Sequence, residues 1–513
     1  MKNFLRSAVK MSCGTVLSRV SGFIRDIFIA KYLGTSAFSD VFFLAFRIPN
    51  FFRKIFAEGA VNSAFTPIFA SGVQVHGKQK MMTFARNIFS ILLYSLFIFT
   101  IFIEIIMPYL MCLLAPGYID KTEQFNLIVS LTRITFPYLI FISLVSLISG
   151  ILNTFNRFFV VSISPVLLNL TIIIATIIFR NYLPKQLITF MSYSIVVAGI
   201  VQLIWIIVFS IRDKIYIFPT FPKLTPSAKE FFSKFFSAFL ASGITQINSM
   251  IDSTIATLIP NAVSLLYYAD RIYQFPLSLI GTTIGITILP TLARKLSKKG
   301  NKEEAQELQE DAIFISCLLG IPSGIGIFVL SNIVIKILFQ RGEFTAENTI
   351  QVANILKIYS LALPFFIISK ILQTIFYAKK DTKTPMKNSI YCLIINTVIS
   401  FSLVFIIGAN GIAIGTTISA IFTTFSLLHK LIKDKIFILS DELLIKLLKI
   451  IYSSIIMGVV VYSINKYLIN ISMFDMLKLI ISISCGGIVF LLLSLLLNII
   501  NIRELLLYFK KEE

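Results

Sequence analysis

The sequence predicts an all-α polytopic membrane protein of about fourteen transmembrane helices, with two six-helix pseudo-symmetric halves and two additional C-terminal helices. Three observations support this prediction: an apolar composition, apolar segments along the whole chain, and internal similarity at an offset of about 225 residues. Of 513 residues, 57% are hydrophobic and 14% are charged. Soluble domains carry roughly 25% charged residues, so little of this chain is left for a soluble domain.

The apolar segments have the length that a membrane span requires. A helix rises about 1.5 Å per residue, so about 20 residues cross a hydrocarbon core of roughly 30 Å. The segments are continuously apolar rather than alternating, which excludes a β-barrel. We place the spans at residues 8–30, 38–70, 86–113, 127–152, 159–180, 187–210, 231–258, 262–292, 311–335, 350–377, 386–407, 411–429, 443–465 and 475–500.

Basic residues alternate between the predicted loops and thereby indicate the orientation. Cytoplasmic loops are enriched in Lys and Arg, which predicts that both termini are cytoplasmic in a bacterial cytoplasmic (inner) membrane. The net charge of +21 is then mainly a consequence of topology, and without a soluble basic module we expect no nucleic-acid partner. The basic residues that carry this argument are Lys2, Arg6, Lys10, Lys78, Lys80, Arg212, Lys214, Arg294, Lys295, Lys298, Lys299, Lys379, Lys380, Lys383, Lys433, Lys435, Lys510 and Lys511.

The sequence gives no indication of a catalytic centre or of a cysteine-based metal site. Its five cysteines are isolated within or beside apolar spans, without disulfide or metal-binding spacing. The two histidines, His76 and His429, lie near span ends that we predict to be cytoplasmic. No nucleophile–base pair or phosphate-binding glycine loop is present, so we expect a transporter with no cofactor rather than an enzyme.

Two parts of the chain resemble each other. The segment that starts RIPNFF at Arg47 matches the one that starts RIYQFP at Arg271, and each reaches a proline about 20 residues later. APG at 115–117 likewise matches QRG at 340–342. The repeat predicts an N-terminal six-helix lobe at 1–215, a C-terminal six-helix lobe at 216–435, and two further helices with a cytoplasmic tail at 436–513.

Charged residues inside the apolar spans are the candidate site. A charge at a helix centre costs about 2.5–3.5 kcal/mol on insertion scales, so such residues face partners or a cavity. Arginine donates two parallel hydrogen bonds to phosphate, which predicts a cationic cavity for an anionic head group. Internal pairing, such as Arg25 with Asp40 or Arg271 with Asp270, is the alternative. The cavity residues that we predict are Arg19, Arg25, Asp40, Arg53, Glu58, Asp270 and Arg271, with Asp26, Arg47, Arg133 and Lys370 in support.

A second polar group within the predicted spans has the chemistry of a cation site. Asp252 and its neighbour Asn248 lie in the predicted seventh span, and Asn396 and Thr416 offer further hard oxygen ligands. These residues could bind a small monovalent cation. Hydrogen bonds between helices are the alternative explanation.

The N-terminal region resembles the MurJ (MviN) family of lipid II flippases. The resemblance rests on RDIFIAKYLG, RIPNFFRKIFAEGA and AFTPIFA within residues 18–70, on residues 136–158 and on YYADRIYQFP at 267–276. It implies the multidrug/oligosaccharidyl-lipid/polysaccharide exporter superfamily, and it places the family's cavity charges on Arg19, Arg25, Asp40, Arg53, Glu58 and Arg271, beside Asp270. In such proteins the last two spans line a groove suited to the polyprenyl tail.

The resemblance also implies the activity. Such a protein moves lipid-linked peptidoglycan precursor from the inner to the outer leaflet, with lipid II, membrane lipids and cell-wall synthesis proteins as the expected partners. Na⁺, H⁺, chloride or the membrane potential could reset the empty carrier, and the sequence leaves this choice open. Three alternatives remain at this point: a flippase for another polyprenyl-linked glycan such as O-antigen or capsule units, a multidrug/cation antiporter, and a membrane-bound transferase.

Overall fold

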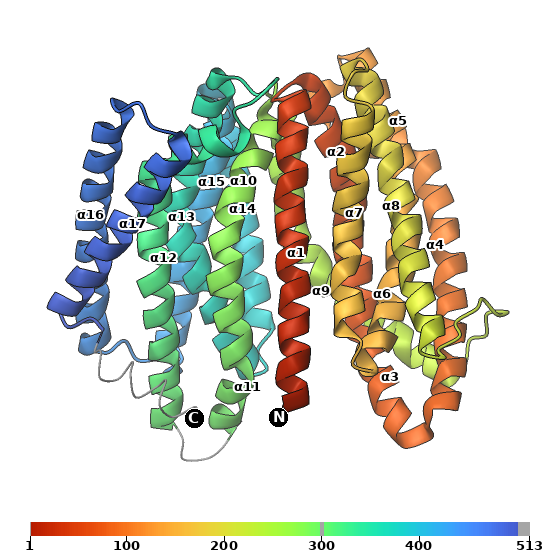
Figure 1. Cartoon of the computed structure of the whole chain (residues 1–513). Helices are drawn as coiled ribbons and strands as arrows, with labels where there is room; N and C mark the ends of the chain where they lie inside the picture. Colours follow the sequence, from red (N-terminus) through yellow and green to blue (C-terminus); the bar gives the residue numbers. More distant parts are fainter. Residues whose placement is uncertain (1, 298–301, 501–513) are drawn as a thin grey trace. The chain divides into compact units, whose positions relative to one another are not determined.

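The computed structural model of the chain describes residues 2–297 and 302–500, and the regular elements in these ranges are helices joined by loops. The chain packs as two compact units, Met1–Ser264 with Arg341–Phe344, and Leu265–Gln340 with Thr345–Glu513. Figure 1 traces the helices in chain order from red to blue. Lys298, Lys299, Lys510 and Lys511, which contributed to the predicted orientation, lie outside the described residues.

Nine long helices and two short helical segments form most of the first unit. The helix α1 packs along α7, α5 packs on α2, and α8 contacts both α6 and α7. The bounds are α1 Lys2–Leu33, α2 Ala37–Arg53, η1 Lys54–Val61, α3 Asn62–His76, α4 Lys78–Leu114, η2 Pro116–Tyr118, α5 Thr122–Thr135, α6 Tyr138–Thr154, α7 Phe158–Ile178, α8 Pro184–Arg212 and α9 Pro226–Ala256.

The second unit begins within α10 and includes the C-terminal helices. The helix α12 packs against α13, α16 and α17, and α15 lies against α13 and α14. Ile371, Ile375 and Phe376 of α13 are fully buried in its core. The bounds are α10 Ala262–Leu277, η3 Ser278–Thr282, α11 Thr283–Ser297, α12 Lys302–Phe339, α13 Ala346–Ala378, α14 Lys383–Ile407, α15 Ala409–Lys433, α16 Asp441–Ile469 and α17 Asp475–Leu496.

Eleven helical stretches of the described chain are long and apolar enough to cross a membrane. This confirms a multi-pass helical membrane protein, whereas the count of fourteen stays a prediction. The predicted spans 8–30, 38–70 and 231–258 are helical but are not among the eleven. Each of them interrupts its apolar run with charged or amide side chains, which lower its mean hydropathy.

The three-part division at residues 215 and 435 also stays a prediction. It was drawn from the sequence repeat, whereas the compact units reflect packing. The helix α9, which follows the first predicted boundary, packs on η1, α3 and α4 within the first unit.

Prolines shape the helices that carry the charged residues. Pro49 lies inside α2 and lacks an N–H, so the carbonyl of Ala45 loses its partner in the helix. The hydroxyl of Thr135 in α5 donates to that carbonyl at 2.9 Å. Pro137 similarly separates α5 from α6 within the predicted span 127–152. A buried hydroxyl thus replaces the missing backbone donor where α2 meets α5.

Both segments of the internal match contain a π-helix. The second predicted span changes from α2 to η1 over Lys54–Val61, and the eighth changes from α10 to η3 over Ser278–Thr282. The π-helix frees backbone carbonyls locally, and Ser146 of α6 donates to the carbonyl of Ala57 at 2.5 Å. Each π-helix lies about seven residues beyond the Arg-Ile pair that begins its segment.

We expect Thr135→Val to destabilise the protein by about 1–3 kcal/mol, because it leaves the buried carbonyl of Ala45 without a hydrogen-bond donor. The thermal unfolding midpoint of the purified protein measures this effect. Thr83→Val is the matched control, since the exposed Thr83 hydroxyl bonds only to the Gln79 carbonyl of its own helix. Equal midpoints for the two variants would contradict the assignment.

Candidate functional site

Arg25 is buried between α1 and α7, and each of its three guanidinium nitrogens donates to a side chain. It is 4% exposed, and its neighbour Asp26 is 1% exposed. The Nε and Nη2 atoms of Arg25 donate to Oδ1 of Asp26 at 3.0 and 2.7 Å, and Nη1 donates to Oδ1 of Asn169 at 3.0 Å. The guanidinium therefore stays in one orientation, fixed from its own helix and from α7.

Asn169 and Phe46 complete the surroundings of Arg25. The Nδ2 group of Asn169 donates to the Ser18 carbonyl at 3.2 Å and to Ser21 Oγ at 2.9 Å. The ring of Phe46 lies 5.5 Å from the guanidinium carbon, within the range of a cation–π interaction. Sequence reasoning missed Asn169. Its signal is a single amide in an otherwise apolar span, which in membranes indicates an interhelical hydrogen bond.

Asp40 is fully buried and holds the start of α10. Its Oδ1 accepts the backbone N–H of Ser264 at 2.8 Å, and its Oδ2 accepts the hydroxyl of Tyr118 at 3.2 Å. A carboxylate at a helix N-terminus satisfies a free N–H and complements the helix dipole. Burial raises the pKa of Tyr118, and the nearby carboxylate of Asp40 raises it further, so the phenol remains a donor. In this conformation Asp40 positions helices and does not face solvent.

Arg53 and Glu58 form an ion pair along η1. They are five residues apart, and the i→i+5 hydrogen bonding of a π-helix places such residues near one another. Nε of Arg53 also donates to Oδ1 of Asn50 at 3.1 Å, and Nδ2 of Asn50 donates to the carbonyl of Phe46 at 3.1 Å. The side chain of Arg53 is 23% exposed and that of Glu58 is 57% exposed, so this pair is accessible while Arg25 is buried.

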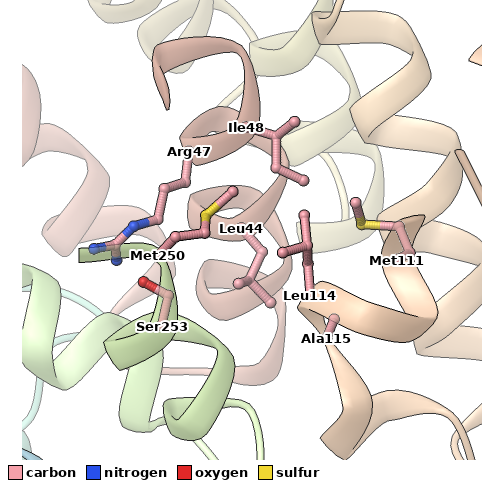
Figure 2. A pocket seen from close by; sticks show the side chains of 8 residues that line it. All are labelled: Leu44, Arg47, Ile48, Met111, Leu114, Ala115, Met250 and Ser253. Carbon is pink, nitrogen blue, oxygen red and sulfur yellow. The ribbon is translucent and has the colours of Figure 1, made fainter. Parts of the chain in front are cut away.

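Arg47 links α2 to α9 beside two recesses. Its Nη2 donates to the carbonyl and to Oγ of Ser249, both at 2.7 Å. One recess of about 270 Å³ is lined mainly by polar and basic residues, which include Lys54, together with Phe51 and Met250. The other, of about 250 Å³, is mainly apolar, and Figure 2 shows the guanidinium of Arg47 pointing away from its apolar side chains. These side chains are Leu44, Ile48, Met111, Leu114, Ala115 and Met250.

The remaining predicted site residues lie at other positions. Arg19 of α1 and Lys370 of α13 are exposed. Arg133 of α5 is also exposed, and its Nε donates to the carbonyl of Glu104 in α4 at 3.0 Å. In the second unit, Nη2 of Arg271 donates to the hydroxyl of Tyr267 at 2.9 Å, with the guanidinium carbon 5.1 Å from that ring.

Asp270 accepts a hydrogen bond from Gln274, one turn further along α10. The structure therefore brings Arg25 and Asp26 together, and Arg53 and Glu58 together. A single cavity that joins these residues to Arg271 stays a prediction.

The predicted cation site also stays a prediction. Asp252 is half-buried in α9 of the first unit, whereas Asn396 and Thr416 belong to α14 and α15 of the second. Oδ1 of Asn396 accepts from Ser400 Oγ at 3.2 Å, and the Thr416 hydroxyl donates to the Ile412 carbonyl at 3.0 Å. Within the described residues, no group of three or more His, Cys, Asp or Glu side chains could hold a metal ion.

The fold and the site define a class of protein: a multi-pass helical membrane protein with buried and half-buried arginines in its N-terminal helices. The model of the family described as "Lipid II flippase MurJ" matches residues 29–482. The chain belongs to this family, and it is therefore a transporter rather than an enzyme.

Individual relatives agree with this assignment. The chain is 38% identical to the "Probable lipid II flippase MurJ" of Rickettsia prowazekii, over 81% of each chain. It is 31% identical to the protein of that name from Buchnera aphidicola subsp. Acyrthosiphon pisum, over 99% of each chain.

Two solved structures place the fold. One described as "Lipid II flippase MurJ, inward closed conformation" matches with a TM-score of 0.80 and 27% identity, over 95% of this chain and 98% of that chain. An inward-facing multidrug resistance MATE family transporter of the MOP superfamily matches with a TM-score of 0.68 and 15% identity, over 84% and 98% of the two chains. At 15% identity, the second match shows only that this chain and the MATE family transporter share a fold.

We expect Asp40→Ala to lower the free energy of unfolding by about 1–3 kcal/mol or more, because the buried N–H of Ser264 loses its acceptor. Tyr118→Phe should cost less, about 1 kcal/mol, because it removes one bond to Asp40 and leaves that from the Ser264 N–H in place. Thermal unfolding of the purified variants measures both. Asp120→Ala, at an exposed neighbouring acid, is the control and should leave the midpoint unchanged. A midpoint for Asp40→Ala equal to the control would contradict this role for Asp40.

Proposed function

We propose that this chain moves lipid II from the inner to the outer leaflet of the bacterial cytoplasmic membrane by alternating access. The observation that carries the proposal is family membership over most of the chain, at 31–38% identity to relatives named probable lipid II flippases. Lipid II consists of a disaccharide-peptide on a polyprenyl diphosphate. Its charged head needs a path through the hydrocarbon, whereas its tail can stay in the lipid.

The arginines of the N-terminal helices suit the diphosphate. Arg25 is pre-oriented by Asp26 and Asn169, so a phosphate that displaced one of these partners would meet a fixed fork of donors. Arg53 and Lys54 add positive charge at a more exposed level, beside the polar recess at Arg47. We propose that the head group first meets the accessible charges of η1, and that Arg25 and Arg271 bind it when the carrier changes conformation.

The two π-helices support the proposed pair of lobes. Pro67 and Pro290 follow η1 and η3 inside α3 and α11, so the two segments share a proline as well as a π-helix. Two repeats in parallel orientation imply a path between them that opens to either side by rocking. We propose cytoplasmic N- and C-termini on the basis of the Lys and Arg distribution.

The C-terminal helices α16 and α17 suit contact with the polyprenyl tail of lipid II. Helices α16 and α17 pack against each other and against α12, and close approach there depends on small residues. A Cβ atom on Gly458 would lie 2.6 Å from Ile325 Cγ2 of α12, and one on Gly486 would lie 2.6 Å from Val461 Cγ2 of α16. We propose that the outer surfaces of these helices, which expose Ile, Leu and Val side chains, contact the polyprenyl chain.

Depletion of the protein in a cell with no second flippase tests the function. We expect outer-leaflet lipid II to fall while the inner-leaflet pool rises, since synthesis continues on the cytoplasmic side. Susceptibility of lipid II to an externally added cleaving enzyme measures the outer pool. Re-expression of the intact chain is the control and should restore it. An undiminished outer pool after depletion would overturn the proposal.

A paired substitution separates substrate binding from ion pairing at Arg25. We expect Arg25→Ala to abolish lipid II transport and to destabilise the protein by about 3–5 kcal/mol, because it removes the cation beside a buried carboxylate. The double variant Arg25→Met with Asp26→Leu should recover stability but stay inactive. Transport of labelled lipid II in proteoliposomes and thermal unfolding are the two measurements.

Arg180→Ala, at an exposed arginine, is the matched control and should be active. We also expect Arg271→Ala to insert into the membrane and fail to transport. If the double variant at 25 and 26 transports normally, Arg25 serves only to pair with Asp26, and the proposed diphosphate contact is wrong.

A further inference from the structure

In each of two loops of the first unit, a glycine contacts the end of a helix that is far away in the sequence. The first is the loop between α4 and α5, where the N–H of Gly117 donates to Oγ1 of Thr257 at 3.2 Å. Thr257 directly follows α9. A Cβ atom on Gly117 would lie 1.9 Å from the carbonyl oxygen of Thr257, closer than any real contact, so a side chain at position 117 is incompatible with this approach.

The second loop is Arg341–Phe344, which packs within the first unit. The N–H of Glu343 donates to the carbonyl of Lys31, near the end of α1, at 2.9 Å. A Cβ atom on Gly342 would lie 2.2 Å from that carbonyl oxygen, and one on Gly34 would lie 2.4 Å from the carbonyl oxygen of Glu343. Both glycines have positive φ angles, +59° and +57°, which other residues rarely adopt.

The two contacts are equivalent positions of the repeat. Gly117 and Gly342 are about 225 residues apart, and so are Lys31 and Thr257. Each contact therefore joins a loop of one predicted lobe to the end of the first helix of the other predicted lobe. The buried bonds from Tyr118 and Ser264 to Asp40 lie next to the first contact and add to it.

We propose that these two contacts, the paired glycine clasps, hold the predicted outer side of the carrier shut, and that both must part before the head group can leave. The inference rests on the proposed alternating-access function and deepens it. A hydrogen bond such as Gly117 N–H to Thr257 Oγ1 or Glu343 N–H to the Lys31 carbonyl is worth about 0.5–1.5 kcal/mol net, so these two bonds bias the closed conformation without locking it. Because each clasp joins the two predicted lobes, the lobes cannot separate on this side while either clasp remains closed.

Alanine substitutions at the clasp glycines test the proposal. Gly342→Ala and Gly117→Ala should each open the outer side more often, and a cysteine at the buried Thr35, 7% exposed, should report it. The probe is a membrane-impermeant maleimide, applied to a chain whose five native cysteines are replaced. We expect labelling of Thr35→Cys to become about tenfold faster in each variant, as about 1.4 kcal/mol of destabilisation gives.

Gly408→Ala is the matched control. Gly408 also has a positive φ angle, +62°, but a Cβ atom there would have nothing within 4 Å. Gly408→Ala therefore strains a positive-φ position, as Gly342→Ala does, without touching a clasp, and its labelling rate should equal that of the parent. Equal rates in Gly342→Ala, Gly117→Ala and Gly408→Ala would overturn the proposal.

A disulfide tests the same point without disturbing a glycine. The side chains of Lys31 and Glu343 are exposed, and the backbone bond between these residues brings their Cα atoms toward the range of about 4.4–6.8 Å that a disulfide spans. We expect oxidation of Lys31→Cys with Glu343→Cys to stop lipid II transport in proteoliposomes and reductant to restore it. Undiminished transport by the cross-linked protein would overturn the clasp.

Opening of the outer side and transport of lipid II are measured separately. Maleimide labelling of Thr35→Cys follows opening and does not need lipid II. Faster labelling in the alanine variants of a protein that moves no lipid II would support the clasps and contradict the proposed substrate. Unchanged labelling together with normal lipid II transport would contradict the clasps alone.

Discussion

The energetic cost of placing charge in hydrocarbon is the constraint on which this structure depends. Arg25 could not stay buried in the N-terminal helices without Asp26 and Asn169, which receive its donors. Asn169 in turn fixes α7 against α1 through Ser18 and Ser21. The buried charge of Arg25 therefore determines which helices pack together, apart from any role in the proposed binding of substrate.

The backbone follows the same rule where the helices depart from regular geometry. Pro49 and the π-helix η1 each free carbonyl groups, and hydroxyls of Thr135 and Ser146 on neighbouring helices satisfy those of Ala45 and Ala57. Unpaired backbone groups are costly in a membrane, so each freed carbonyl requires a hydrogen-bond donor on a neighbouring helix at the same depth. The irregular second span is consequently tied to α5 and α6, and its charged residues hold defined positions without a regular helix.

Much of the fold could be predicted from the sequence, because apolar length is a local property. Every predicted span is helical, and the charges that marked the candidate site lie on the expected segments. The partners of those charges could not be predicted in this way. Asn169 is 144 residues from Arg25, and Ser264 is 224 residues from Asp40, so only tertiary packing pairs them. Arg25 and Asp40, which one alternative pairs with each other, have other partners. Arg25 donates to Asp26 and Asn169, and Asp40 accepts from Tyr118 and Ser264.

The π-helices of the second and eighth predicted spans have a consequence for how such a chain can vary. One extra residue in an α-helix turns everything beyond it by about 100°, since each turn holds 3.6 residues. The π-helix η1 accommodates that rotation between α2 and α3. The direction in which α2 presents Arg47 therefore does not fix which side of α3 packs on α6. Substitutions that change the charged residues of α2 can therefore accumulate while α3 keeps its packing against α6. One span thus contains two separately adjustable pieces.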